Sequence, residues 1–248
     1  MENKTGKRGI ADRLLFLLSV PRCVNCKERL SYGDLAFCPE CSVGFEEFKT
    51  RNCSVCSLPL VECSCSFEGL SDSYVRRVLK VFRYIPREEN KLPNSLVFAL
   101  KQANRRDVID RCARELSVAL GNSGTDFSDW IVTNVPRRRS AILKYGFDHA
   151  EQLAIALARS VGAVYLPLLK SKSRAAQKQL SSEQRRENVE FIIKGAPDLK
   201  GKRVLIVDDV ITTGASVAEA ARLIHSLGAK EIVAASLSIA YKDRNIPF

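Results

Sequence analysis

The chain has little of several residue types that often carry chemistry. Its 248 residues include two histidines, one methionine and one tryptophan, and only 7% of them are aromatic. Both histidines, His149 and His225, fall in helical patterns, and neither is assigned a catalytic role. Because aromatic residues are scarce, any binding to nucleic acid should depend mainly on charge rather than on base stacking.

The sequence also lacks a long hydrophobic run, which excludes a segment able to span a bilayer. The apolar stretch Ile10–Val20 is short, carries Asp12 and Arg13, and leads into Pro21 rather than into a small-residue cleavage site. It is therefore expected to be a docking helix and not a signal peptide or an anchor. The expected location is cytoplasmic, with peripheral association at the inner membrane left open. A Walker-type phosphate loop is excluded as well, because no Gly-Lys-Ser/Thr follows a strand.

Positive charge is in excess, since 39 Lys and Arg residues stand against 28 Asp and Glu residues, for a formal net charge of +11. This balance favours anionic partners such as nucleotides, nucleic acid or a lipid surface, but no basic run is long enough to choose among them. The length has room for one α/β domain and a small module. We expect an N-terminal helix at residues 1–20, a cysteine module at 21–66 and an α/β domain at 67–248.

Eight of the nine cysteines lie between residues 23 and 65, and their spacing predicts metal binding. Each Cys-x2-Cys turn points two thiolates at one place, and two such turns complete a tetrahedral Zn²⁺ site in a segment too small to fold on apolar burial alone. The expected ligands are Cys23, Cys26, Cys38 and Cys41 for one ion, and Cys53, Cys56, Cys63 and Cys65 for a second. Sites made only of thiolates have no vacant position, so the metal should be structural.

Alternatives to this double zinc ribbon stay open. Interleaved ligation or an empty second site would fit the tight Cys63-x-Cys65 spacing. A disulfide framework would need an oxidising compartment and a secretion signal. The ninth cysteine, Cys112, lies in a helical apolar pattern and is expected to be a buried apolar residue.

The most informative segment runs from residue 204 to residue 216. Its first four residues are apolar without alternation, which predicts a strand covered on both faces of a parallel sheet, and the apolar spacing from Val217 onward predicts a helix. Between them stand two acidic residues and a loop of small residues around Gly214. Such a loop lets several N–H groups converge on a phosphate at a helix N-terminus. The paired carboxylates would suit the vicinal hydroxyls of a ribose.

This segment resembles the phosphoribosyl-pyrophosphate (PRPP) motif of type I phosphoribosyltransferases, in which four hydrophobic and two acidic residues precede Thr-Thr-Gly and a small hydroxyl residue. The resemblance implies that Asp208 and Asp209 hold the ribose 2′- and 3′-hydroxyls. It implies that the 5′-phosphate is held by Thr212, Thr213, Gly214, Ala215 and Ser216. PRPP would bring Mg²⁺, which keeps several of its waters. The alternative is an ordinary helix cap behind a solvated Asp pair.

The rest of the chain carries α/β patterning. The apolar spacing predicts strands at 78–84 and 129–135, helices at 94–100, 107–120 and 150–161, and further apolar segments at 164–169 and 189–193. Arg137 and Arg138 follow the second strand, at the edge where α/β sheets bind ligands. Residues 170–188 are polar, as a mobile segment covering a substrate would be; a solvated surface excursion is the alternative.

Several features together resemble the ComF family, over nearly the whole chain. They are the zinc ribbon before the domain, Lys101 in Ala-Leu-Lys, Val135-Pro136, Gly146-Phe147, and the series Gln177, Leu180, Arg185 and Asn188. The resemblance implies an α/β fold of the type I phosphoribosyltransferase kind, with a parallel sheet flanked by helices and a small N-terminal double zinc ribbon. The family usually has Arg-Gly-Phe-Asn-Gln where this chain has Tyr145 to His149, so one expected cation is missing.

The resemblance implies two alternative functions. The first is a PRPP-binding protein of competence, the uptake of single-stranded DNA, with other competence proteins as partners of the zinc ribbon. The second is an active phosphoribosyltransferase of nucleotide or base salvage, with an unidentified acceptor and with Asp208 and Asp209 in its catalytic site. In both, Arg137 and Arg138 are the candidates for pyrophosphate.

Further candidates follow from charge and from aromatic character. The cations that could close over pyrophosphate are Lys172, Arg174 and Arg185. The aromatic residues that could stack on bases are Phe37, Phe45, Phe48 and Tyr84, and their buried packing is the alternative.

Overall fold

A computed structural model gives the fold of the chain. It describes residues 20–53, 56–60, 70–84, 91–102, 104–172, 191–195 and 197–240. The expected N-terminal docking helix, Cys63, Cys65, Arg174, Arg185 and most of the polar segment 170–188 lie outside these ranges.

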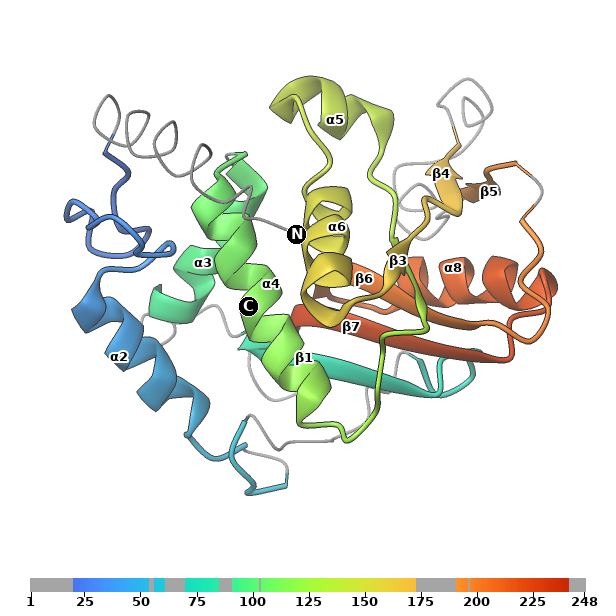
Figure 1. The fold of residues 1–248 in the computed structure, drawn as a ribbon, viewed down its shortest axis with the longest axis horizontal. Coiled ribbons are helices and arrows are strands. Elements are labelled where there is room, and N and C mark those ends of the chain that lie inside the picture. The colour runs from blue at the N-terminus through green and yellow to red at the C-terminus, as the bar shows by residue number, and fades with distance from the viewer. Residues whose placement is uncertain are drawn as a thin grey trace, which may run out of the picture.

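The described chain contains both helices and strands (Figure 1). The helices are α2 (Pro39–Lys49), α3 (Lys91–Gln102), α4 (Arg106–Gly121), α5 (Arg139–Tyr145), α6 (His149–Val161) and α8 (Ala215–Ser226). The strands are β1 (Arg77–Tyr84), β2 (Ile131–Asn134), β3 (Val164–Tyr165), β4 (Leu169–Ser171), β5 (Phe191–Ile193), β6 (Arg203–Ile211) and β7 (Glu231–Ala240).

Five strands form a parallel sheet in the order β1-β7-β6-β2-β3. The central strands β6 and β7 are buried along most of their length, which explains their nearly unbroken apolar sequences. Because all five strands run the same way, the loops that follow β2 and β6 leave the same edge of the sheet. Separately, β4 and β5 pair antiparallel.

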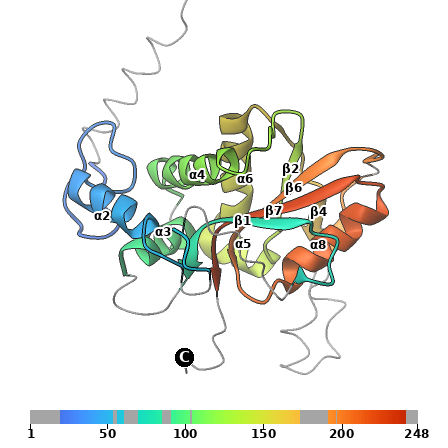
Figure 2. The ribbon, with the colours of Figure 1, turned by 90° about the horizontal axis from the view of Figure 1, so that it is seen from below.

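Helices cover both faces of the sheet (Figure 2). One face packs under α4 and α6, and its core includes Leu205 and Val207 of β6. The other face packs against α8, and its core includes the alternate residues Val204 and Ile206. Neighbouring residues of β6 therefore point to opposite sides of the sheet, as the pleat of a strand requires.

The cysteine-bearing segment packs on the α/β domain rather than standing apart from it. Phe45 and Phe48 of α2 each lie with their ring centroid 6.1 Å from that of Phe82 in β1. These three rings belong to the same continuous core as the α4 and α6 face of the sheet. Phe37, Phe45 and Phe48 are all at most 5% exposed, so the suggestion that they stack on bases is wrong, because they fill the core.

A buried group of charges fixes the same interface. Glu115 of α4 is 4% exposed; it accepts a hydrogen bond from Lys49 of α2 at 2.6 Å and forms an ion pair with Arg111, whose Nε lies 2.7 Å away. Glu46 of α2 closes the group, 2.7 Å from the Lys49 amine and 3.1 Å from the Arg111 guanidinium. Two cations and two anions share the interface, and three of the four side chains are at most 8% exposed, whereas Glu46 is 56% exposed.

The predicted elements agree well with the structure from residue 77 onward, and the differences have local causes. The strand predicted at 129–135 is shorter, because Asp129 and Trp130 precede it and Val135 already leaves it. Lys170, expected in a mobile segment, belongs to β4 and pairs with Ile192. Helices α2 and α5 and strand β7 were not predicted. Helix α5 buries none of its residues, so its apolar residues do not form a core-facing pattern.

Candidate ligand-binding site and cysteine cluster

The loop between β6 and α8 has the form expected of an anion cradle. Thr212 and Thr213 are exposed, and Gly214 adopts φ 80°, a left-handed conformation that side chains rarely tolerate. Gly214 is the N-cap of α8, so the N–H groups of the first helical turn, which have no partner within the helix, face this loop. The hydroxyl of Thr213 accepts from the Ala215 N–H at 3.4 Å. Positive backbone dipoles and small side chains thus meet at one point.

The two carboxylates before this loop have different surroundings. Asp209 is 6% exposed, and its Oδ2 lies 2.7 Å from Nε2 of His149 and 3.2 Å from Nζ of Lys101. Its Oδ1 accepts from the Val210 N–H at 2.7 Å. Burial alone would raise the pKa of Asp209, but the contact with His149 and the charge of Lys101 outweigh burial and hold the pKa well below its usual range.

Asp208 is less enclosed by protein. Its side chain is half-buried, and one oxygen accepts from the Asp209 N–H at 2.9 Å. The pKa of Asp208 is raised well above its usual value, mainly by desolvation and secondly by the negative charge of Asp209. Of two adjacent carboxylates, the one beside the cations stays charged and the other favours the proton.

The loop after β2 leaves the same edge of the sheet. Asp148 is the N-cap of α6, where its side chain accepts from the Ala150 and Glu151 N–H groups, and it also accepts from the Arg137 N–H at 3.0 Å. The Arg137 guanidinium lies over the Tyr145 ring, 5.0 Å from its centroid. Arg137 and Arg138, which were predicted to bind pyrophosphate, thus lie on the loop before α5, and the Arg137 N–H joins this loop to the N-cap of α6. The contacts described for Arg137 join it to Tyr145 and Asp148 and not to the carboxylate pair.

Sequence reasoning missed the closest partners of Asp209. His149 was left without a role, and Lys101 was noted only as part of a family pattern. The contacts join residues 60 and 108 positions apart, so no local pattern could reveal them. The one available signal was the departure from the family's Arg-Gly-Phe-Asn-Gln at the position of His149.

Four cysteines of the N-terminal segment converge. The Sγ atoms of Cys23, Cys26, Cys38 and Cys41 all lie within 4.8 Å of one another. In a tetrahedral site with Zn–S bonds of about 2.3 Å, the sulfurs are about 3.8 Å apart, so this group fits such an ion with little adjustment. The four-cysteine cluster suggests a structural metal. The seven cysteines that the structure describes are free thiols, which disfavours the disulfide alternative within these ranges.

The two halves of the cluster differ in form. Cys23 and Cys26 lie on a tight turn in which Lys27 adopts φ 69°. Cys38 is the N-cap of α2, and Cys41 lies in its first turn, so this pair sits at a helix start and not on the hairpin turn that the zinc-ribbon prediction implied. Burial would raise the pKa of the Cys23 thiol, but hydrogen bonds from backbone N–H groups, that of Cys38 first, outweigh burial and lower the pKa to about 7.

A second turn of the same form carries Cys53 and Cys56. In the first turn, the Cys23 N–H donates to the backbone carbonyl of Glu28 at 2.7 Å, and the Lys27 N–H donates to the backbone carbonyl of Cys23 at 3.1 Å. In the second turn, the Cys53 N–H donates to the backbone carbonyl of Leu58 at 2.7 Å, and the Ser57 N–H donates to the backbone carbonyl of Cys53 at 2.8 Å. The sequence offsets are the same in both turns. Ser57, at φ 59°, takes the place of Lys27.

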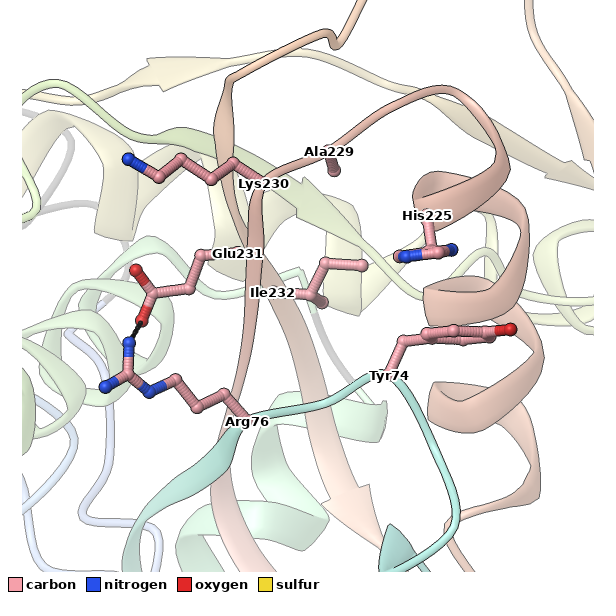
Figure 3. Close-up of a pocket in the computed structure, with 7 residues that line it drawn as sticks. All are labelled: Tyr74, Arg76, His225, Ala229, Lys230, Glu231 and Ile232. Carbon is pink, nitrogen blue, oxygen red and sulfur yellow. Dashed lines mark hydrogen bonds and ion pairs between the residues drawn. The ribbon is translucent and has the colours of Figure 1, made fainter.

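A cavity of about 190 Å³ lies at the opposite edge of the sheet, where β7 begins (Figure 3). It is lined by Tyr74, Arg76, His225, Ala229, Lys230, Glu231 and Ile232. The Tyr74 ring stacks on His225 with centroids 3.9 Å apart, and Arg76 pairs with Glu231 at 2.8 Å. Because parallel strands begin at this edge and end at the other, the cavity is separate from the acidic pair.

Comparison with known proteins agrees with this geometry. Residues 141–245 match the phosphoribosyl transferase domain family. The chain is 28% identical over 226 residues to the DNA utilization protein YhgH of Escherichia coli O157:H7, which covers 87% of this chain and 96% of that protein. A shorter match, 45% identical over 62 residues, is to ribose-phosphate pyrophosphokinase of Saccharolobus solfataricus; it covers 24% of this chain and 21% of that protein.

Among solved structures, a purine phosphoribosyltransferase from Pyrococcus horikoshii aligns with a TM-score of 0.37 and 24% identity, over 56% of this chain and 78% of that one. Residues 141–245 match a phosphoribosyl transferase domain, and a four-cysteine cluster lies in the N-terminal part of the chain. In particular, the chain is homologous over most of its length to the DNA utilization protein YhgH. A phosphoribosyl transferase domain implies PRPP binding. No helix within the described residues is long and apolar enough to cross a membrane.

Proposed function

We propose that the chain binds PRPP at the loop 212–216 and acts in DNA utilization. The observation that carries this proposal is the cradle itself: a left-handed Gly214 opens α8 at the carboxyl edge of β6, directly after two carboxylates. A 5′-phosphate would accept from the first N–H groups of α8 and from the hydroxyls of Thr212, Thr213 and Ser216. The ribose hydroxyls would face the acidic pair, and Mg²⁺ would travel with the pyrophosphate.

Single-stranded DNA is the proposed second ligand, and α5 is the surface that suits it. Leu143 is 77% exposed and Tyr145 is 37% exposed, and α5 buries no residue. Arg137 and Lys144 hold their charges 5.0 and 5.1 Å from the centre of the Tyr145 ring. An accessible aromatic ring with cations beside it suits a base and its phosphate. The Arg137 N–H donates to Asp148, and the next residue, His149, contacts Asp209, which links this surface to the end of β6.

One observation favours phosphoribosyl transfer as a second candidate function. The Lys101 side chain is 38% exposed while its amine lies 3.2 Å from Asp209, so a cation reaches the edge where pyrophosphate would leave. In transfer, the acceptor nitrogen forms a bond to C1′ as the bond to pyrophosphate breaks and its electron pair departs with the leaving group. Neutralising that charge is what such a reaction requires of the protein. The acceptor is unidentified.

We propose Zn²⁺ as the metal of the Cys23, Cys26, Cys38 and Cys41 cluster. The repeated turn at Cys53 supports a second ion, completed by Cys63 and Cys65. The proposed division of the chain into a helix at 1–20, a zinc module at 21–66 and a phosphoribosyltransferase-like domain at 67–248 follows from this assignment. Competence proteins are the proposed partners of the zinc module.

Calorimetric titration with Mg²⁺-PRPP tests the central proposal. The wild-type protein should bind, and an Asp208→Asn, Asp209→Asn double variant should lose most of that affinity while it remains folded. Release of pyrophosphate with a panel of acceptors then separates transfer from binding alone. Absence of PRPP binding by the folded, metal-loaded protein would refute both functions.

A further inference from the structure

The cavity at the start of β7 has an apolar floor beside an exposed pair of aromatic rings. Ile232 is 2% exposed and Ala229 is 7% exposed, and both line the cavity. The rings of Tyr74 and His225 stack with their planes 12° apart, while Tyr74 remains 52% exposed. Figure 3 shows the Ile232 side chain pointing toward this pair. Such walls suit a planar ring, because bases stack on aromatic side chains and apolar surface.

The size of the cavity limits what it holds. Its volume of about 190 Å³ corresponds to about six water molecules at about 30 Å³ each. Pockets that enclose a whole small-molecule ligand begin at about 300 Å³. The cavity therefore has room for one ring system and leaves the rest of a larger ligand outside.

Tyr74 is held in place by the backbone on both sides. Before it, the Ser73 hydroxyl donates to the Leu70 carbonyl at 2.7 Å. After it, the Arg76 N–H donates to the Ile232 carbonyl at 2.9 Å, where β1 begins beside β7. The ring is thus positioned before any ligand arrives, which lowers the entropy cost of binding.

Three lysines gather beside the cavity, because the turns before β6 and β7 pack closely together. The Lys230 N–H donates to the Lys202 carbonyl at 2.7 Å, and the Gly201 N–H donates to the Gly228 carbonyl at 3.2 Å. Gly228 has φ 88°, and a Cβ there would lie 3.2 Å from Cα of Lys200. A glycine is therefore needed for this approach, which brings Lys200, Lys202 and Lys230 to one edge of the sheet.

The amines of these lysines have no partner. All three side chains are exposed, and none has an ion pair or a hydrogen bond among the residues that the structure describes. Arg76, at the same edge, pairs with Glu231. In Figure 3 the Lys230 side chain extends away from the stacked rings. A phosphate that it binds would thus belong to a neighbouring nucleotide and not to the one whose ring fills the cavity.

We propose that this edge binds single-stranded nucleic acid, with one base in the cavity beside Tyr74 and His225 and neighbouring phosphates at Lys200, Lys202 and Lys230. This inference rests on the proposed DNA utilization and adds a second contact to that of α5. The two surfaces are separate, because α5 follows the end of β2 whereas the cavity lies where β7 begins in the same parallel sheet. A strand that contacts both must pass around the sheet.

The salt dependence of binding tests the lysines. Single-stranded DNA of about 20 nucleotides is titrated by fluorescence at several salt concentrations. Lys202→Ala, Lys230→Ala should reduce the slope of log affinity against log salt by about 1.4, which is two phosphates at about 0.7 each. The matched control is Arg114→Ala, Arg159→Ala, which removes two exposed cations from α4 and α6 and should leave the slope unchanged. Equal slopes in the two double variants would overturn the inference.

Substitution of Tyr74 tests the base in the cavity. Tyr74→Ala should weaken binding of the same oligonucleotide about tenfold, within the range measured for the loss of one stacked base. Tyr74→Phe keeps the ring and should retain the affinity. Because Tyr74 is half exposed, neither change should unfold the protein, and thermal unfolding checks this. Equal affinity of the Ala and Phe variants would also overturn the inference.

A spectroscopic signal locates the strand directly. The chain has two histidines, so ¹⁵N spectra contain two imidazoles, and His225→Gln identifies them. Binding of the oligonucleotide should shift the His225 signals. If the oligonucleotide binds and His225 does not shift, the inference fails while the proposed function stands. If the wild-type protein binds no single-stranded DNA, the proposed DNA utilization fails and the inference falls with it; titration with Mg²⁺-PRPP tests the other ligand independently.

Discussion

The buried charges between α2 and α4 allow a quantitative test of how firmly the cysteine segment is bound to the domain. Glu115→Gln keeps the shape of the side chain and removes the negative charge that Lys49 and Arg111 share. Removing one partner of a buried ion pair destabilises a protein by about 3–5 kcal/mol. Glu46 lies within 3.1 Å of both cations and offsets part of that loss, so we expect about 3 kcal/mol.

Urea unfolding of the metal-loaded protein measures this loss. For a slope of about 3 kcal/mol per molar urea, the midpoint should fall by about 1 M. Glu46→Gln is the matched control: its side chain is 56% exposed, so its loss should cost less than about 1 kcal/mol. If both variants shift the midpoint equally, the buried position of Glu115 does not matter, and the reasoning about this interface is refuted.

Four other predictions concern the site, the metal and the DNA surface. Gly214→Ala forces a side chain onto a backbone with φ 80° and should lower the stability by about 1 kcal/mol as well as the PRPP affinity. Gly121→Ala is the control: it lies at the end of α4 with no atom near its new Cβ and should change neither quantity. Calorimetry and thermal unfolding measure both variants. The pKa of Asp208 is raised in the folded protein, so its contribution to stability is fully present below its unfolded-state pKa and is lost as pH rises through its folded-state pKa. Asp208→Asn should therefore raise the melting temperature at pH 7 and not at pH 3. An equal gain at both pH values would contradict this sign. Removing metal with a chelator should lower the melting temperature of the whole chain in a single transition, because α2 shares the core of the sheet; loss of metal without any shift in scanning calorimetry would count against the shared core. Arg139 and Lys144 are the two exposed cations within α5. Replacing both by Ala should reduce the slope of log affinity for single-stranded DNA against log salt by about 1.4, which is two phosphates at about 0.7 each; an unchanged slope in fluorescence titrations would show that α5 is not the DNA surface.

The phosphate loop could be predicted from sequence because its determinants are local. Apolar residues without alternation specify β6, and Gly214 followed by helical spacing specifies the start of α8. The cluster of Cys23, Cys26, Cys38 and Cys41 was predicted for the same reason, since the spacing of each pair sets its geometry.

The partners of Asp209 could not be predicted in the same way. Lys101 and His149 come from α3 and α6, and only the tertiary fold brings both side chains to Asp209 of β6. The sequence also does not distinguish the two aspartates, although in the structure Asp209 is the more buried of the two and lies beside both His149 and Lys101. The form of the second cysteine pair depended on α2, whose apolar residues Phe45 and Phe48 are explained only by the surface that they cover.

The paired turns at Cys23 and Cys53 bear on how the N-terminal segment acquires its ion. Each loop is already closed by its own main-chain hydrogen bonds, so two sulfurs are aimed before any cation arrives. Little chain entropy is then lost at the moment of capture, and the turn itself needs no metal to hold its shape. The ion would instead hold the start of α2, with Cys38 and Cys41, against the turn that carries Cys23 and Cys26.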